Sequence, residues 1–315
     1  MTTISRRRAL TGAVLAAPLA GLGPAAARAG TQTLADPLAD PLADPLVDPG
    51  RDGLDERLAD LERAHGGRLG VAVLNLGSGR RVDHRSGERF LMCSTFKVLA
   101  AALVLARVDR GDERLDRRVV FSRDDLVPWS PVTETRVGDP GMSMEDLCAA
   151  AMTWSDNTAG NLLLASFGGP SALTAYARAL GDPVTRLDRI EPALNEHDTA
   201  DDVRDTTTPA AMLETLRSLL FTDALSRAGR ARLAAWLMAN KTGATRIRAG
   251  LPSTWLFGDK TGSNSRASGN LNDIGIAWPS DRAPVIVTGY CRMPSRTPEE
   301  RNGVLAAVGR IAAQV

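Results

Sequence analysis

The spacing of hydrophobic residues predicts that the folded part of the chain begins near residue 52. Leucines recur at a helical spacing between Asp52 and His65, which predicts a helix there. Two short strand-like segments follow, Leu69–Leu76 and Arg81–His84, with turn-forming glycine and serine residues between them. The pattern therefore predicts a helix followed by two neighbouring strands.

The pattern is helical in the middle of the chain and strand-like again near its end. Residues 94–239 are expected to be mostly helical. Three strands and a final helix are expected after residue 255, at Trp255–Lys260, Leu271–Trp278, Pro284–Tyr290 and Thr297–Ala313. Strands at both chain ends around a helical middle predict a discontinuous α/β domain (residues 52–86 and 240–315) with an inserted all-helical domain (residues 87–239).

The first 51 residues have the pattern of an export signal followed by a spacer. Three adjacent arginines, Arg6 to Arg8, precede an uncharged stretch that leads to the small-x-small sequence Ala27-Arg28-Ala29. This predicts a signal peptide of the twin-arginine type over residues 1–29, cleaved near Ala29. Residues 30–51 contain an Asp-Pro-Leu-Ala repeat, whose regular prolines prevent both a helix interior and a sheet ladder. We expect a secreted protein, extracellular or periplasmic, without a membrane anchor.

The composition is ordinary for a globular protein. Hydrophobic residues make up 43% and charged residues 24% of the 315 positions, which excludes wholesale disorder and a multi-span membrane protein. The formal net charge is +1, so no nucleic acid is expected as a partner. The three histidines and three cysteines lack metal-ligand spacing, so we expect no metal site, and thiols that are free or buried.

Ser94 and Lys97 form the first candidate site, at the start of the apolar segment Val98–Val108. Residues three apart on a helix share a face, so Lys97 should lie over Ser94. The first turn of a helix offers unpaired N–H groups that can hold an oxyanion, and a neutral lysine can accept the proton of a serine. Alone, the pair is more typical of a capping serine beside a surface lysine.

Two further motifs carry polar groups. Ser155-Asp156-Asn157 lies between two expected helices, Met144–Thr153 and Thr158–Phe167, where a turn and a helix cap are the ordinary explanation. Lys260-Thr261-Gly262-Ser263 leaves an expected strand, and its lysine and hydroxyls, beside a glycine that lets a ligand approach, suit an anionic substrate group. The same three letters occur at Lys241-Thr242-Gly243, which we expect to be only the end of the helix Ala231–Asn240.

The segment from Glu191 to Asn195 is the fourth candidate. Pro192 keeps Glu191 out of helical geometry. A carboxylate and an amide on one loop could together hold a water molecule, as a hydrolytic step requires. Arg189 and Asp205 flank this loop and could close it as an ion pair. The ordinary alternative is a solvated loop without chemistry.

Together, the motifs S-x-x-K, S-D-N, E-x-x-L-N and K-T-G, in this order between about residue 52 and the C-terminus, resemble those of the class A serine β-lactamases. The resemblance implies a two-domain serine β-lactamase and penicillin-binding-protein-like fold, in which an antiparallel sheet flanked by helices meets the all-helical domain at the active site. It implies hydrolysis of penicillins and some cephalosporins, and hence antibiotic resistance. A monomer that needs no cofactor is also implied.

The resemblance gives each matching position an expected role. Ser94 would be the acylated nucleophile, Lys97 its proton partner, and Ser155 the proton relay to the lactam nitrogen. Glu191 and Asn195 would hold and activate the deacylating water. The substrate would be bound by Asn157, Lys260, Thr261, Gly262 and Ser263, with Trp129 at the cleft mouth and the backbone N–H groups of Ser94 and Ser263 as oxyanion hole. Whether Lys97 or Glu191 is the base in acylation stays open.

Some positions depart from the pattern of the family. Gly269 stands where many members have an arginine that binds the substrate carboxylate, and Arg246 is the expected replacement. Asn264 stands where carbapenem-hydrolysing members often have a cysteine, which leaves Cys93 without that disulfide partner and argues against strong carbapenemase activity. A penicillin-binding DD-peptidase or a β-lactam sensor, which acylate without turnover, are the alternatives. The loop around Glu191 favours the hydrolase.

Overall fold

The computed structural model describes residues 51–197, 199, 201–264 and 269–315. The predicted signal peptide and the predicted spacer, except its last residue, lie outside the described residues. The first described element, α1 (Arg51–His65), coincides with the predicted helix within one residue.

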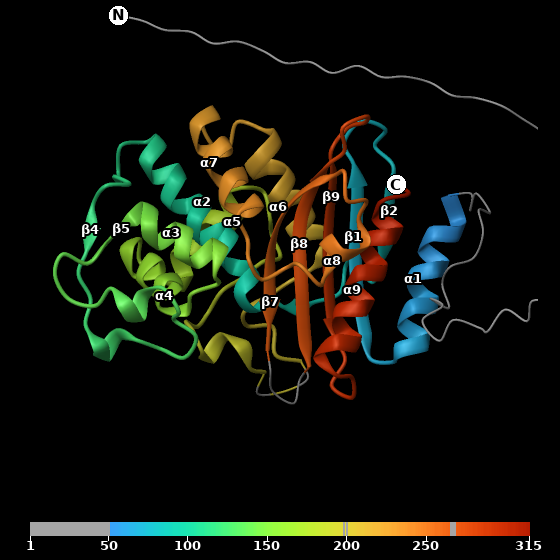
Figure 1. The fold of residues 1–315 in the computed structure, drawn as a ribbon, viewed down its shortest axis with the longest axis horizontal. Coiled ribbons are helices and arrows are strands. Elements are labelled where there is room, and N and C mark those ends of the chain that lie inside the picture. The colour runs from blue at the N-terminus through green and yellow to red at the C-terminus, as the bar shows by residue number, and fades with distance from the viewer. Residues whose placement is uncertain (1–50, 198, 200, 265–268) are drawn as a thin grey trace, which may run out of the picture. The chain divides into compact units, whose positions relative to one another are not determined.

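Five antiparallel strands form the main sheet, in the order β2-β1-β9-β8-β7. They are β1 (Arg68–Asn75), β2 (Arg81–His84), β7 (Leu256–Ser263), β8 (Asn270–Trp278) and β9 (Val285–Arg292). The first two strands come from the beginning of the folded region and the other three from its end, so segments far apart in the chain share one sheet (Figure 1).

The middle of the chain is mostly helical and is built around α2 (Phe96–Asp109), which is buried from Phe96 to Ala106. A helix that is apolar on every side is expected at such a central place. The other elements, with η for 3₁₀ helices, are β3 (Phe90–Leu91), η1 (Cys93–Thr95), β4 (Arg118–Val119), η2 (Arg123–Asp125), η3 (Thr133–Thr135), β5 (Met142–Ser143), α3 (Met144–Thr153), α4 (Asn157–Ser166), α5 (Pro170–Ala179), η4 (Ala193–Asn195), β6 (Thr206–Thr207), α6 (Pro209–Phe221), α7 (Arg227–Met238), α8 (Ile247–Gly250) and α9 (Pro298–Ala312).

Both faces of the main sheet are buried. Successive side chains of a strand point to opposite faces, and apolar side chains occur on both faces of this sheet. In β9, Val285 and Val287 belong to one hydrophobic cluster, whereas Ile286 and Tyr290 belong to the other. The first cluster includes residues of α1 and α9, and the second continues into the helical part around α2 (Figure 1). The sheet therefore separates two hydrophobic cores.

The predicted fold class is confirmed, and most predicted elements agree with the structure to within a few residues. The clearest difference is β7, which was expected to end at Lys260 and instead continues to Ser263. Thr261 to Ser263 pair in register with β8, so the ladder continues through the motif. The K-T-G-S segment therefore lies inside an edge strand. The exact domain boundaries near residues 87 and 240 stay a prediction.

Candidate active site

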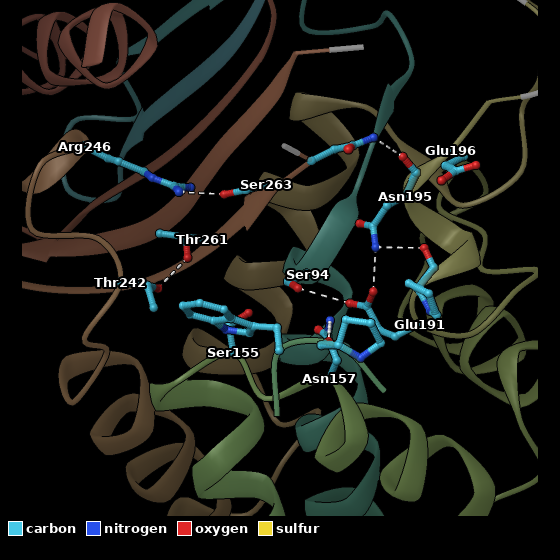
Figure 2. A pocket seen from close by; sticks show the side chains of 14 residues that line it. Ser94, Ser155, Asn157, Glu191, Asn195, Glu196, Thr242, Arg246, Thr261 and Ser263 are labelled. Carbon is cyan, nitrogen blue, oxygen red and sulfur yellow. Dashed lines mark hydrogen bonds between the residues drawn. The ribbon is translucent and has the colours of Figure 1, made fainter. Parts of the chain in front are cut away.

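A cavity of about 580 Å³ lies beside the edge strand β7, where segments from distant parts of the chain meet (Figure 2). Its wall draws on η1, the α3–α4 turn, the η4 loop, β7 and the segment before α8. The lining residues are Ser94, Pro128, Trp129, Ser155, Asn157, Glu191, Pro192, Asn195, Glu196, Thr242, Arg246, Thr261, Ser263 and Asn264. All four predicted motifs therefore contribute to one cavity.

Ser94 lies in η1, the short 3₁₀ turn that runs directly into α2. Lys97 Nζ lies 2.8 Å from Ser94 Oγ, as expected for residues three apart on one helical face. Ser94 Oγ also lies 3.2 Å from Glu191 Oε1. The serine hydroxyl therefore has two bases within hydrogen-bond reach.

The side chain of Lys97 is fully buried and surrounded by oxygen atoms. Its Nζ donates to the carbonyl of Ser155 over 2.9 Å and to Oδ1 of Asn157 over 2.6 Å, and it lies 3.2 Å from Glu191 Oε1. Burial lowers the pKa of Lys97, although the Glu191 carboxylate opposes this shift. A neutral Lys97 amine can donate to Ser155 and Asn157 and keep its lone pair for the Ser94 proton.

The turn between α3 and α4 holds Ser155 against the second buried lysine. Asp156 caps α4, so the tripeptide contains a helix cap, and the Asp156 carboxylate also accepts hydrogen bonds from the backbone and the hydroxyl of Thr133. Ser155 has a positive φ of 58°, and its Oγ accepts a hydrogen bond from Lys260 Nζ over 2.9 Å. This turn therefore presents Ser155 to the cavity with a lysine directly behind it.

Asn157 and Trp129 lie side by side in the cavity wall. The side-chain amide of Asn157 donates to the carbonyl of Pro128 over 2.8 Å, and its backbone N–H donates to the carbonyl of Trp129 over 2.9 Å. The Trp129 indole donates to the carbonyl of Trp154 over 3.1 Å, yet Trp129 is 64% exposed. An exposed aromatic ring thus lines the cavity, and its placement at the cavity mouth stays a prediction.

Glu191 is buried, and its carboxylate joins two polar groups of the cavity. Oε1 faces Ser94, and Oε2 accepts a hydrogen bond from Asn195 Nδ2 over 2.5 Å (Figure 2). Asn161 of α4 holds the backbone of Glu191, because its side-chain amide bonds both the carbonyl, at 3.0 Å, and the N–H, at 2.9 Å. Asn161 was not singled out from the sequence, since an amide on a helix surface is ordinary.

An ion pair closes the loop that carries Glu191, as the sequence predicted. Arg189 Nε lies 2.6 Å from Oδ2 of Asp205, and the Asp205 carboxylate is fully buried. Oδ1 of Asp205 also accepts the backbone N–H groups of Asp188 and Arg189. The two ends of the loop are therefore fastened to each other, which limits the movement of Glu191.

Arg246 forms a cationic end of the cavity. Its guanidinium donates to the carbonyls of Gly262, at 2.9 Å, and Asn272, at 2.6 Å, and to Ser263 Oγ, at 2.7 Å (Figure 2). Burial lowers the pKa of Arg246, and Asp273 opposes this shift most strongly. The guanidinium is thus fixed against β7, with one edge at the cavity wall.

The second K-T-G copy is not merely the end of a helix, which corrects the expectation from sequence. α7 ends at Met238, and the chain then turns so that Thr242 Oγ1 hydrogen bonds Thr261 Oγ1 (Figure 2). Both threonines line the cavity next to Arg246. A local sequence pattern could not indicate this, because the contact depends on how the segment folds back onto β7.

Lys260 lies behind the cavity wall rather than in it. The side chain is fully buried, and its Nζ donates to Ser155 Oγ and, over 2.8 Å, to the carbonyl of Thr261. Burial, with the charges of Lys97 and Arg246, lowers the pKa of Lys260 well below its usual range. Among the residues of its motif, Thr261 and Ser263 reach the cavity directly.

Two glycines have tight surroundings that explain their identity. A Cβ at Gly262 would lie 2.6 Å from the carbonyl oxygen of Met92 and 3.2 Å from Cβ of Cys93, so this glycine lets β7 approach η1 rather than a ligand, contrary to expectation. A Cβ at Gly269 would lie 2.6 Å from Cα of Pro294, and its φ is +60°. An arginine at position 269 therefore does not fit, and among the described residues that line the cavity Arg246 is the cation.

Asn264 ties the end of β7 to the Glu191 loop. Its Nδ2 donates to the backbone carbonyl of Asn195. Cys93, which directly precedes Ser94, is buried and free, as are the other two cysteines, which agrees with the prediction from their spacing.

No histidine lines the cavity, and His84 instead contacts the carboxylate of Glu62 at 3.2 Å. Among the described residues, no three His, Cys, Asp or Glu side chains group as a metal site. None of the helices in that part of the chain is both long and apolar enough to span a membrane.

Comparison with known proteins gives one consistent family. A sequence profile described as "Beta-lactamase enzyme family" matches residues 53–315. Beta-lactamase OXY-2 from Klebsiella oxytoca is 45% identical over 263 residues, 84% of this chain and 89% of the relative. Beta-lactamase AST-1 from Nocardia asteroides is 48% identical over 257 residues, 82% of each chain. The solved structure of an ancestral (GNCA) class A β-lactamase has a TM-score of 0.79 at 58% identity, covering 82% of this chain and 98% of that one.

Proposed function

The chain belongs to the class A serine β-lactamases, and we propose that it hydrolyses penicillins, and some cephalosporins, through an acyl-enzyme formed on Ser94. Hydrolysis opens the lactam ring of the antibiotic and so confers resistance. Three groups of contacts support this proposal: those of Ser94, those of Glu191 and those of Arg246.

In the acylation step, Ser94 Oγ attacks the lactam carbonyl carbon. The serine proton passes to Lys97 Nζ, 2.8 Å away, or to Glu191 Oε1, 3.2 Å away. Collapse of the tetrahedral intermediate breaks the carbon–nitrogen bond, and Ser155 delivers a proton to the departing nitrogen. The proton that left Ser94 then passes on to Ser155, which frees the base, and Lys260 supports this transfer because its Nζ holds Ser155 Oγ at 2.9 Å.

In the deacylation step, Glu191 removes a proton from a water molecule that attacks the ester carbon. The water is held between the Glu191 carboxylate and the amide of Asn195, which already contact each other at 2.5 Å. The ester bond to Ser94 Oγ then breaks, and Ser94 takes up the water proton from Glu191, 3.2 Å away. Asn161 and the ion pair of Arg189 with Asp205 keep Glu191 in place for this step.

The substrate lies along the cavity with its carboxylate toward Arg246. The hydroxyls of Thr261, Ser263 and Thr242 surround the same end, and charge-assisted hydrogen bonds to a carboxylate are among the strongest available. Asn157 binds the acylamino side chain, and the Trp129 ring covers the cavity mouth. The backbone N–H groups of Ser94 and Ser263 form the oxyanion hole.

The single observation that carries the proposal is that the Glu191 carboxylate touches both Ser94 and Asn195. A peptidase or sensor that only acylates has no need of such a hydrolytic group. The test is steady-state hydrolysis of a penicillin and a cephalosporin by the purified protein. Turnover of many equivalents of the penicillin supports the proposal. Consumption of a single equivalent, followed by no further reaction, contradicts it.

We also infer that residues 1–29 direct export by the twin-arginine route, with the protein released after cleavage near Ala29. The support comes from the sequence pattern and from membership of the family, since these residues lie outside the described part of the chain. N-terminal sequencing of the exported protein checks the cleavage site. Replacing Arg6 and Arg7 by lysine should retain the protein in the cytoplasm, and unchanged export would contradict the assignment.

A further inference from the structure

Two buried carboxyl groups lie behind the cationic end of the cavity. Asp259 of β7 and Asp273 of β8 are both fully buried, and neither lines the cavity. In the register of the two strands, Asp273 pairs with Thr261 and Asp259 with Gly275. The two acids are therefore diagonal neighbours on one face of the sheet, which is the face that carries Thr261.

The hydrogen bonds around the two acids differ. Both oxygens of Asp259 accept N–H donors, Oδ1 from Arg248 at 2.8 Å and Oδ2 from Asn240 at 2.6 Å. Oδ2 of Asp273 accepts the backbone N–H of Ile247 at 3.1 Å, whereas its Oδ1 is buried and has no donor among the described residues. Asp259 thus has the partners of a carboxylate, and Oδ1 of Asp273 is where a proton fits.

The charges around Asp273 favour its neutral form. Burial and the negative charge of Asp259 hold the pKa of Asp273 well above its usual range, and Arg246 opposes this shift. The titratable and charged groups on the same face of the sheet as this acid, from β7, β9 and the α8 segment, are Asp259, Cys291, Arg246 and Arg248. Lys260 and Tyr290 lie on the opposite face of the sheet and interact with Asp273 electrostatically from there. Two negative charges side by side in this interior would be costly, whereas one proton shared between the carboxyl groups removes the repulsion.

Both acids are connected to residues that line the cavity. Asn240, which donates to Asp259, accepts a hydrogen bond from Thr242 Oγ1 at 2.8 Å, and Thr242 contacts Thr261. Asp273 holds the N–H of Ile247, the residue next to Arg246. The segment from Asn240 to Arg248 is therefore fastened to the sheet by this pair of acids.

We propose that Asp259 and Asp273 form a buried acid pair that shares one proton, which resides on Asp273, and that this pair positions Arg246 and Thr242 to bind the substrate carboxylate. The inference rests on the proposed function, because it assumes that this end of the cavity holds the carboxylate. Neither acid touches the substrate, so both are positioning residues. The neutral Asp273 carboxyl donates a hydrogen bond to Asp259 and so joins the two strands and the α8 segment.

The test compares Asp273→Asn with Asp273→Ala in the full chain, using KM and kcat for a penicillin across the pH range. An asparagine keeps an acceptor for Ile247 and donates to Asp259, so Asp273→Asn should leave KM unchanged. The alanine removes both bonds and frees the segment that carries Arg246, so KM should rise about tenfold with a smaller change in kcat. In the wild type, KM should also rise at alkaline pH as Asp273 loses its proton, and this rise should be absent in Asp273→Asn.

A control variant and a second readout separate this proposal from a general loss of stability. Asp182 is another buried carboxylate with three donors, away from the cavity, and Asp182→Ala should leave KM unchanged. The pKa of Asp273 is higher in the folded state than in the unfolded state. The free energy of unfolding should therefore fall as the pH rises from the pKa of the unfolded state to that of the folded state. Asp273→Asn should lack this fall.

Two outcomes would overturn the acid pair: a KM in Asp273→Asn as high as in Asp273→Ala, or the same pH dependence of stability in Asp273→Asn and the wild type. The stability measurement needs no substrate, so it can be made on both variants and on the wild type whatever their activity. Failure of the wild type to hydrolyse a penicillin would instead overturn the proposed function and leave the stability result intact.

Discussion

Lys260 Nζ donates a hydrogen bond to Ser155 Oγ over 2.9 Å, although the two residues are 105 positions apart in the chain. The lysine is fully buried in an edge strand, and the serine lies in a turn between two helices of the other half of the fold. This contact connects the sheet to the helical part directly at the cavity wall. It also gives Ser155 Oγ a hydrogen-bond donor from behind the cavity wall.

Lys260→Ala should lower kcat/KM for a penicillin by about 100-fold, because Ser155 Oγ loses the group that holds it for proton transfer. Lys241→Ala is the matched control, since Lys241 belongs to the second K-T-G copy but is exposed and does not line the cavity. Its kcat/KM should equal that of the wild type. An active Lys260→Ala enzyme would remove Lys260 from the proton path.

Glu191→Ala should allow acylation of Ser94 but slow deacylation by about 10² to 10⁴-fold, because the attacking water loses its general base. Mass spectrometry of the variant after mixing with a penicillin should show a persistent covalent adduct. Glu214→Ala, which removes a half-buried carboxylate on α6 that does not line the cavity, should show no such adduct. Full turnover by Glu191→Ala would contradict the role of Glu191, and the absence of any adduct would make Glu191 the base for acylation as well.

Arg246→Ala should raise KM for penicillins by about 10 to 100-fold, because a charge-assisted hydrogen bond contributes about 1.5–3 kcal/mol. Expression should stay normal, and kcat should change less than KM. The control is Arg232→Ala, which removes an arginine that pairs with Glu145 on the surface of the helical half. If KM for Arg246→Ala equals that of the control, another group binds the substrate carboxylate.

Gly262→Ala should destabilise the fold by about 1–3 kcal/mol, because the added methyl group would overlap the carbonyl of Met92 and force β7 away from the turn that holds Ser94. Chemical denaturation measures this loss, and kcat should fall with it. Gly303→Ala in α9 is the control, since a Cβ there meets no atom within 4 Å and alanine favours helices. Equal stability of the two variants would rule out the close contact at Gly262.

The sequence predicted those parts of the site that depend on local spacing. Ser94 and Lys97 meet because residues three apart lie on one helical face, and Asp156 caps a helix because it directly precedes one. Arg189 and Asp205, 16 positions apart, pair across the base of the loop that carries Glu191. In each case the local structure brings the two groups together without help from the rest of the fold.

The parts that the sequence did not predict depend on packing between distant segments. Thr242 lines the cavity because its turn folds onto β7, and Gly262 is needed because β7 lies against η1. Asn161 holds Glu191 from a helix 30 positions earlier. Such contacts follow from the placement of whole elements, so no pattern within any one segment indicates them.

The most direct test of the account is steady-state hydrolysis of a penicillin by the wild-type protein and by Ser94→Ala, measured in parallel. The account predicts that the wild type converts many equivalents of the antibiotic, and that Ser94→Ala, although folded, converts none above the uncatalysed rate and forms no covalent adduct. Hydrolysis by Ser94→Ala at the rate of the wild type would contradict the acyl-enzyme on Ser94, on which every step of the proposed reaction depends.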